Sequence, residues 1–384
     1  MLFSEIYGHE NIKKHLTQSV ENGRVPHAQL FVGPEGSGTL PIAIAYAQYL
    51  LCNNTNGENN TGDSACNLKF NNLSHPDLHF AFPVTTTESV KSKPTSSLFL
   101  SEWRALLKEQ PYCNLFDLHK KLGTEKKQSQ IGVYEAQEII KKLSLKSYEG
   151  GFKVMIIWMA EKMNIECSNK LLKLIEEPPK KTVLILIAEQ EDSVIGTIKS
   201  RCQIVHFPAL SEEVIKNALI QNYSLETAVA TKIANQANGN YNKACDLVYQ
   251  DSEDIQFEEW FVLWVRSAFK AKGNKAAIHD LISWSEGIAK TGRETQKQFL
   301  HFCLEFFRQS MLYNYNVKSL VYMEPKISNF ELRKFAPFVH ENNIIDINNE
   351  LNNAIYHIER NGNAKIILTD LSIKLTRLLH KKSN

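Results

Sequence analysis

Short apolar runs separated by segments of helical periodicity fill the first half of the chain. The clearest runs lie at 29–32, 153–158 and 182–187 and are rich in β-branched and other apolar residues. Runs of this kind are typical of strands that are buried on both faces of a parallel sheet. We therefore expect residues 1–208 to form an α/β domain whose sheet is covered by helices. Residues 84–130 form an insertion in it, to which the pattern assigns no role.

The pattern changes after Pro208. Residues 209–250 predict three short helices, the first capped by the Ser211 hydroxyl. From 255 to 384 the periodicity is helical throughout, and aromatic side chains recur on one face at Phe257, Trp260, Phe261 and Trp264. Such a stripe is more typical of a hydrophobic core than of a ligand site. The sequence thus predicts three domains, 1–208, 209–250 and 255–384.

A glycine-rich turn follows the first predicted strand and has the frame of a phosphate-binding loop. Gly33, Gly36 and Gly38 keep the spacing of that loop. A working loop surrounds phosphates with backbone N–H groups, places a lysine on the outer phosphates and binds Mg²⁺ through a Ser/Thr hydroxyl. Here Thr39 stands in place of the lysine and Leu40 in place of the hydroxyl. The loop has kept its frame and lost its chemistry.

The strand at 153–158 shows a second loss. A P-loop ATPase carries a Mg²⁺-binding Asp at the end of this strand, usually followed by a Glu that polarises the attacking water. This chain has Trp158 and Met159 there, and Glu161 lies too far along to replace them. We therefore expect no intrinsic catalysis. Backbone N–H groups of residues 36–39 could still attract a phosphate, so nucleotide binding without hydrolysis stays open.

Further motifs point to a family. They are an N-x-L-L-K-x-x-E-E-P-P helix at 169–179, a T-I-x-S-R-C turn at 197–202, and the segments at 7–10 and 75–80. Together they resemble the bacterial clamp-loader branch of the AAA+ ATPases, most strongly over 1–208. Within that branch, the degenerate nucleotide motifs resemble those of the delta-prime family of DNA polymerase III and not those of the ATP-hydrolysing gamma/tau subunits.

The resemblance implies a fold, a role and partners. The fold would be an AAA+ P-loop-type sheet domain followed by a small helical lid and an all-helical collar. Arg201, flanked by Ser200 and Cys202, would be an arginine finger that reaches into the ATP site of a neighbouring gamma/tau subunit, since its planar, permanently charged fork suits a transferring phosphoryl group. In the lid, Asn242 stands where active members carry an arginine that senses the nucleotide.

The implied partners are gamma/tau and delta subunits, the sliding clamp and, through the assembled complex, primer–template DNA. An alternative function stays open, in which the chain is a gamma/tau-like AAA+ subunit that hydrolyses ATP through an atypical P-loop. For Arg201 itself the alternative is an ordinary surface salt bridge.

The seven cysteines are scattered and include no C-x-x-C pair. Related chains often bind zinc through four cysteines after the P-loop helix, but only Cys52 and Cys66 fall in that region. Two thiolates do not close a tetrahedral site, and the two histidines that could add to them are His75 and His79. We expect no metal and no cofactor. Unpaired cysteines suit a reducing cytoplasm.

Composition narrows the function classes. A formal net charge of +2 gives no overall electrostatic attraction for nucleic acid, and no basic or aromatic-basic motif suggests a free-standing nucleic-acid binder. The chain has no N-terminal hydrophobic signal and no apolar run of about 18 residues. We therefore expect a cytoplasmic protein that neither enters a membrane nor is secreted.

Overall fold

A computed structural model of the chain describes residues 1–52, 65–149, 151–249, 252–272, 274–317, 320, 321, 323, 325, 327 and 330–382. The chain divides into two compact units. Unit 1 comprises Met1–Thr124 and Ser129–Cys245, and unit 2 comprises Glu125–Gln128 and Asp246–Asn384. Within the described residues, no helix combines the length and the apolar character that crossing a membrane requires.

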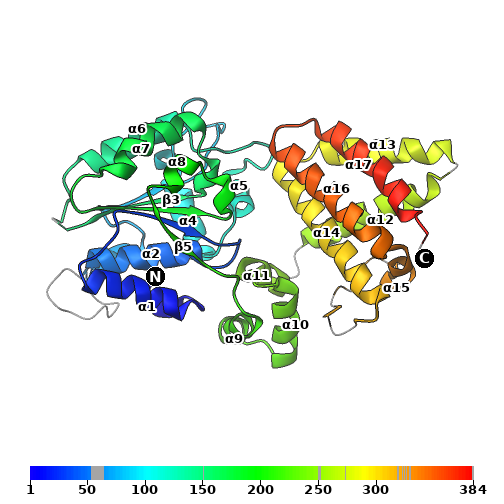
Figure 1. Cartoon of the computed structure of the whole chain (residues 1–384), viewed down its shortest axis with the longest axis horizontal. Helices are drawn as coiled ribbons and strands as arrows, with labels where there is room; N and C mark the ends of the chain where they lie inside the picture. Colours follow the sequence, from blue (N-terminus) through cyan, green and yellow to red (C-terminus); the bar gives the residue numbers. More distant parts are fainter. Residues whose placement is uncertain are drawn as a thin grey trace. The chain divides into compact units, whose positions relative to one another are not determined.

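Unit 1 is built on a five-stranded parallel sheet with strand order β2-β3-β4-β1-β5 (Figure 1). The strands are β1 Ala28–Val32, β2 Leu78–Ala81, β3 Lys153–Trp158, β4 Thr182–Ala188 and β5 Gln203–His206. Every residue of β1, β3 and β4 is buried, which is why these strands are continuous apolar runs in the sequence. The parallel sheet predicted for 1–208 is confirmed.

Helices cover both faces of this sheet. Side chains alternate across a strand, so Leu30, Ile157 and Leu186 share one face, where they pack with α6 and α7. Helices α1 and α2 lie on the opposite face (Figure 1). The helices of this part are α1 Glu10–Glu21, α2 Thr39–Cys52, α3 Ala65–Asn71, α6 Val133–Ser144, α7 Ile165–Glu176 and α8 Gly196–Lys199. Short 3₁₀ turns are η1 Phe3–Glu5, η3 Ala160–Lys162 and η4 Glu191–Ser193.

The insertion at 84–130 folds as η2 Ser96–Phe99, α4 Leu100–Glu109 and α5 Leu115–Leu122. Its core is Trp103, which is fully buried. The Trp103 ring stacks on Phe82, with ring centroids 4.4 Å apart, and lies 5.0 Å from the ring of Trp158 at the end of β3. The insertion is therefore packed against the sheet, at the strand end that holds the nucleotide in an active ATPase.

Three helices follow the sheet: α9 Glu212–Tyr223, α10 Thr227–Ala237 and α11 Tyr241–Tyr249. The Ser211 hydroxyl accepts a hydrogen bond from the Val214 N–H at 3.3 Å, so the predicted cap is confirmed. These helices belong to unit 1 up to Cys245. That they act as a separate lid domain stays a prediction.

Unit 2 is helical, with α12 Ser252–Lys270, α13 Lys275–Ala289, α14 Arg293–Asn314, α15 Leu332–Phe335, η6 Ala336–Phe338, α16 Glu341–Glu359 and α17 Ala364–Leu379. Its core contains the predicted aromatic stripe. Phe257, Phe261 and Trp264 are buried, and Trp260 packs against them. The Trp264 ring stacks on Trp284 at 4.8 Å, so the stripe is core as predicted.

One buried hydrogen bond in unit 2 can be tested directly. Trp264 Nε1 donates to Ser372 Oγ at 2.8 Å, and both side chains are fully buried. Ser372→Ala removes this acceptor and should lower the free energy of unfolding by about 1–3 kcal/mol, the cost of an unsatisfied buried donor. Ser310→Ala is the control, because the buried Ser310 hydroxyl bonds only back to the Phe306 carbonyl of its own helix among the described contacts. If urea denaturation shows equal losses of the free energy of unfolding in Ser372→Ala and Ser310→Ala, this account is contradicted.

A second prediction concerns His79 on β2. Burial, reinforced by the positive charge of Lys142, lowers the pKa of His79 from 6.5 to about 4. The unfolded chain thus binds more protons between these values, so stability is fully present above pH 6.5 and falls as pH drops toward 4, by up to about 3 kcal/mol. His79→Gln should flatten this dependence when unfolding is measured from pH 7 to 4.5, and the exposed His15→Gln should not. An unchanged slope in His79→Gln would show that other groups titrate.

Candidate functional site

The phosphate-binding frame is present between β1 and α2. Gly36 and Gly38 have φ values of +69° and +95°, a backbone region that favours glycine. Their missing side chains also leave room for close neighbours. A Cβ on Gly38 would lie 3.0 Å from Tyr112 Cε1, and a Cβ on Gly36 would lie 1.9 Å from Asn240 Oδ1. Two side chains of the chain itself therefore lie on the loop that would surround phosphates.

Little space remains beside this loop. A cavity of about 30 Å³ is lined by the loop from Gly33 to Pro41 together with Tyr112, Trp158 and Met159. Small-molecule sites commonly have volumes of roughly 300 Å³ or more. The predicted residues Gly33, Gly36, Gly38 and Thr39 thus line a space of about the size of one water molecule, and that they bind a cofactor stays untested.

The end of β3 explains part of this closure. Trp158 and Met159 are each only 4% exposed, and Trp158 packs against Trp103 of the insertion. Met159 has a φ of 57°, in the left-handed region. Glu161 accepts a hydrogen bond from the backbone N–H of Glu189 at 3.2 Å. Where an active ATPase places carboxylates toward Mg²⁺, this chain places apolar side chains against its own insertion.

Polar contacts join the loop to the insertion and to α11. Glu35 Oε1 accepts hydrogen bonds from Asn114 Nδ2 and Asn240 Nδ2, both at 3.0 Å. Asn242 Nδ2 donates to Asp117 Oδ2 at 2.9 Å. Burial raises the pKa of the Asp117 carboxyl. Asn242, at the position of the nucleotide-sensing arginine, thus contacts a carboxylate of the insertion.

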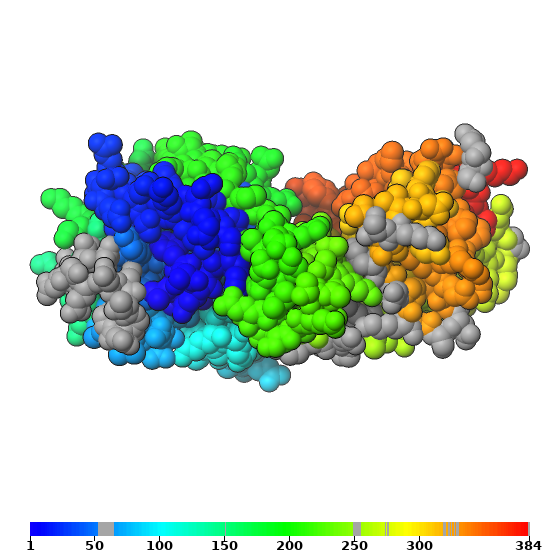
Figure 2. Space-filling model, turned by 90° about the horizontal axis from the view of Figure 1, so that it is seen from below, coloured from blue at the N-terminus to red at the C-terminus, as the bar shows by residue number. Residues whose placement is uncertain are grey.

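Three tyrosines from distant parts of the chain meet over this loop. Their ring centroids are 6.2 Å apart for Tyr7 and Tyr112, 5.1 Å for Tyr7 and Tyr241, and 4.8 Å for Tyr112 and Tyr241. The Tyr7 N–H donates to the Tyr112 hydroxyl at 3.0 Å, and Asn222 bridges the hydroxyls of Tyr7 and Tyr241. Burial raises the pKa of both Tyr112 and Tyr241, so their hydroxyls stay protonated. Figure 2 shows the N-terminal segment, in blue, directly against the helices at 209–245, in green.

The start of the chain also contacts the loop directly. His9 Nε2 donates to the Ser37 carbonyl at 2.7 Å, and the Tyr241 N–H donates to the Gly36 carbonyl at 3.1 Å. No local sequence pattern indicates the tyrosine cluster, because its members lie in three separate segments and one of them, Tyr112, belongs to the insertion without an assigned role.

Arg201 lies elsewhere, in the turn between α8 and β5. Its Nε donates to Glu176 Oε2 at 3.2 Å and its Nη1 to the Thr197 carbonyl at 3.0 Å. About a third of its side chain, 34%, is exposed. The two family motifs therefore meet, since Glu176 belongs to the E-E-P-P helix. Arg201 is not among the described residues that line the small cavity beside the phosphate loop.

The neighbours of Arg201 have local roles. The Ser200 hydroxyl donates to the Thr197 carbonyl at 3.2 Å, which closes the turn. Cys202 packs against the core between the sheet and the helices α6 and α7, and burial raises the pKa of its thiol to about 11. A thiol that stays protonated at neutral pH is a poor nucleophile, which agrees with a packing role.

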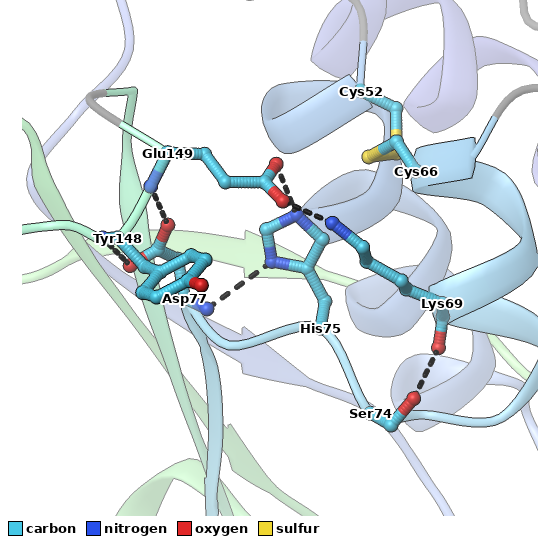
Figure 3. A network of polar contacts seen from close by, with 8 residues as sticks. All are labelled: Cys52, Cys66, Lys69, Ser74, His75, Asp77, Tyr148 and Glu149. Carbon is cyan, nitrogen blue, oxygen red and sulfur yellow. Dashed lines mark hydrogen bonds and ion pairs between the residues drawn. A yellow bond between two sulfur atoms is a disulfide. The ribbon is translucent and has the colours of Figure 1, made fainter.

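The cysteines considered as metal ligands differ from expectation. Cys52 and Cys66 form a disulfide, so the expectation that the cysteines are unpaired is wrong for these two. His75 lies beside Cys66 together with Glu149, with one possible ligand atom of each within 4.8 Å of the others (Figure 3). His79 is not part of this group. That the protein binds no metal stays a prediction.

Comparison with known proteins places the chain in a family. The sequence profile of a family described as "DNA polymerase III, delta subunit" matches residues 8–211. A protein of Bacillus subtilis named DNA polymerase III subunit delta' is 30% identical over 241 residues, which cover 62% of this chain and 59% of that protein. A protein of the same name from Yersinia pestis is 27% identical over 190 residues, which cover 49% of this chain and 44% of that protein.

A third relative carries a different name. The DNA polymerase III subunit tau/gamma of Haemophilus influenzae is 24% identical over 253 residues, which cover 65% of this chain and 30% of that protein. The chain thus spans about half of the length of the delta' proteins that it matches, and less of the tau/gamma subunit. Because the family profile covers more than half of the 384 residues, the chain belongs to the delta-prime family of DNA polymerase III subunits.

Proposed function

We propose that this chain is a non-hydrolysing subunit of the DNA polymerase III clamp loader. It presents Arg201 to the ATP site of an adjacent gamma/tau subunit and helps to load the sliding clamp onto primer–template DNA. Its further partner is the delta subunit, and it acts in the cytoplasm. The observation that carries the proposal is that the chain's own side chains fill its nucleotide site while Arg201 stays partly exposed.

The filled site supports the loss of hydrolysis more strongly than the missing motif residues alone. Thr39, Leu40, Trp158 and Met159 replace four groups that act on phosphate, Mg²⁺ or water. The remaining cavity of about 30 Å³ adds a steric reason, because it is far too small for a nucleotide. Both arguments weigh against the alternative of a gamma/tau-like ATPase.

The contacts of Arg201 support a role outside its own chain. Its pair with Glu176 lies at the surface, where side-chain relative exposures are 34% and 56%. Exposed ion pairs typically contribute about 0–1 kcal/mol, so Arg201 can exchange Glu176 for a phosphate of a neighbour at small cost. A guanidinium offers the planar donor geometry that stabilises charge on a transferring phosphoryl group.

The contacts around the loop suggest how such a subunit acts. In an ATP-binding relative, nucleotide would join the sheet domain to the lid. Here Glu35 is joined to Asn240, and Asp117 to Asn242, by the chain's own hydrogen bonds. Under this proposal the helices at 209–245 hold one position relative to the sheet in every nucleotide state, and the neighbour meets a constant surface.

A first test restores the missing loop residues. Thr39→Lys combined with Leu40→Thr supplies the lysine and the hydroxyl, yet Tyr112 still occupies the loop. We expect no ATP–Mg²⁺ binding tighter than about 1 mM by calorimetry. Adding Tyr112→Ala should open the space and give measurable binding. Binding by the double variant alone would show that Tyr112 is not the barrier. If the unaltered chain hydrolyses ATP and Gly38→Val abolishes this activity, the non-hydrolysing role is contradicted.

A second test concerns Arg201 in the reconstituted clamp loader. Arg201→Ala should leave folding and assembly nearly unchanged, because an exposed arginine contributes little to stability. An arginine finger is worth about 10³-fold or more at its own site, so total ATP hydrolysis should fall partly and clamp loading should fall more. Arg201→Lys should not restore the rate, because an ammonium lacks the planar fork.

Glu176→Gln is the matched control for Arg201→Ala. It weakens the pair but leaves the guanidinium in place. If Arg201 acts in trans, Glu176→Gln should load clamps at close to the parental rate. Equal defects in Glu176→Gln and Arg201→Ala would instead show that the pair is structural, and parental loading by Arg201→Ala would refute the trans-acting role.

A further inference from the structure

The C-terminal end of α2 is covalently joined to α3. The disulfide between Cys52, the last residue of α2, and Cys66, near the start of α3, has a Cα–Cα distance of 5.6 Å. Both residues are buried, at 5% and 8% exposure. A hydrogen bond from Gln48 Nε2 to Asn67 Oδ1 at 2.8 Å adds a second, non-covalent connection between the two helices.

Polar contacts extend this connection to residues 148–149, which precede β3 in the chain (Figure 3). Lys69 of α3 forms an ion pair with Glu149, and Glu149 Oε2 lies 3.1 Å from His75 Nε2. The Asp77 carboxylate accepts hydrogen bonds from the backbone N–H groups of Tyr148 and Glu149 at 2.8 and 3.1 Å. Helix α3, residues 75–77 and residues 148–149 thus form one network, which the disulfide attaches to α2.

The group of Cys66, His75 and Glu149 has the spacing of a metal site, but its hydrogen bonds have the wrong polarity. The Asp77 N–H donates to His75 Nδ1 at 3.2 Å, so Nδ1 holds the lone pair and Nε2 holds the proton that it donates to Glu149. A metal-bound histidine needs a lone pair on the ligating nitrogen and normally donates through the other one. The Glu149 carboxylate also forms an ion pair with the Lys69 ammonium. The cluster is therefore a hydrogen-bonded support for the disulfide.

We propose that Cys52 and Cys66 are a site of thiol–disulfide exchange with low-molecular-weight dithiols, and that the oxidation state of this pair determines how firmly α3 and residues 145–149 are held. This inference does not depend on the proposed function. It rests on the disulfide and on the network that the disulfide attaches to α2.

Reduction of the Cys52–Cys66 disulfide by a dithiol proceeds in two steps. A thiolate of the dithiol attacks one sulfur of the pair, the Cys52–Cys66 bond breaks, and the other cysteine leaves as a thiolate that takes up a proton. The second thiolate of the reagent then attacks the mixed disulfide, which releases the second cysteine and leaves the reagent as a cyclic disulfide. Two electrons pass from the dithiol to the cysteine pair.

Reduction should loosen α3 because it removes the covalent bond between this helix and α2. A helix of seven residues is marginal without tertiary support. Once that bond is broken, α3 depends on non-covalent contacts, which include the buried Phe70 ring beside His75, the Gln48–Asn67 hydrogen bond and the partly exposed Lys69–Glu149 pair. Side chains that α3 and the 145–149 segment present to solvent, such as Leu68 and Tyr148, would then lose a fixed position.

The test uses the full chain in oxidised and dithiothreitol-reduced form. After incubation with glutathione disulfide, alkylation and intact mass should show two fewer reactive thiols than after reduction. Hydrogen exchange in peptides that cover 65–71 and 145–149 should be about tenfold faster or more in the reduced form. Cys66→Ser and Cys52→Ser should show the hydrogen-exchange rates of the reduced chain. Dithiothreitol should not change these rates in either variant. Cys202→Ser, which leaves the pair intact, should respond as the unaltered chain does.

His75→Gln separates the network from a metal site. A glutamine amide can accept from the Asp77 N–H and donate to Glu149, so this variant should keep the disulfide and the exchange difference. Equimolar zinc in the reduced chain that His75→Gln abolishes would overturn the proposal in favour of a metal site. Full alkylation of both cysteines after oxidation, or equal hydrogen exchange in the two forms, would overturn it as well.

Discussion

The contact of Tyr112 and Asn240 with the two positive-φ glycines of the phosphate loop is the constraint on which the rest of unit 1 depends. A loop of this shape leaves backbone N–H groups and an open concave surface that a ligand normally fills. Here the insertion fills it from one side and the start of α11 from the other. The chain thereby obtains from its own side chains the order that related ATPases obtain from a bound nucleotide.

This internal filling links features that otherwise look unrelated. Three segments meet at the loop. The start of the chain reaches it through Tyr7 and His9, the insertion through Tyr112, and the helices after the sheet through Tyr241. Arg201, in the S-R-C turn, takes no part in this filling. Among the described residues, its hydrogen-bond partners are a surface carboxylate and the carbonyl and hydroxyl groups of its own turn.

Much of this could be predicted from local patterns, and the rest could not for identifiable reasons. The buried strands β1, β3 and β4 and the Ser211 cap follow from apolar runs and from capping chemistry, which are local properties. The lost catalytic groups follow from motif spacing.

The tyrosine cluster and the partners of Asn242 depend on how segments more than one hundred residues apart come together. The short strands β2 and β5, four residues each, carry too little pattern to stand out. The Cys52–Cys66 bond escaped because cysteine spacing alone cannot distinguish a pair from two free thiols.

The packing of Trp158 against Trp103 of the insertion has a consequence for the history of such chains. Once a carboxylate at the end of β3 is replaced by an indole that packs under an insertion, a single reversion would bury a charge in an apolar setting and leave a void where the ring had been. Each later adjustment of the surrounding core makes that reversion more costly. The buried packing of the Trp158 ring therefore opposes a return to a carboxylate at this position by one substitution, whether or not selection still acts on the loop.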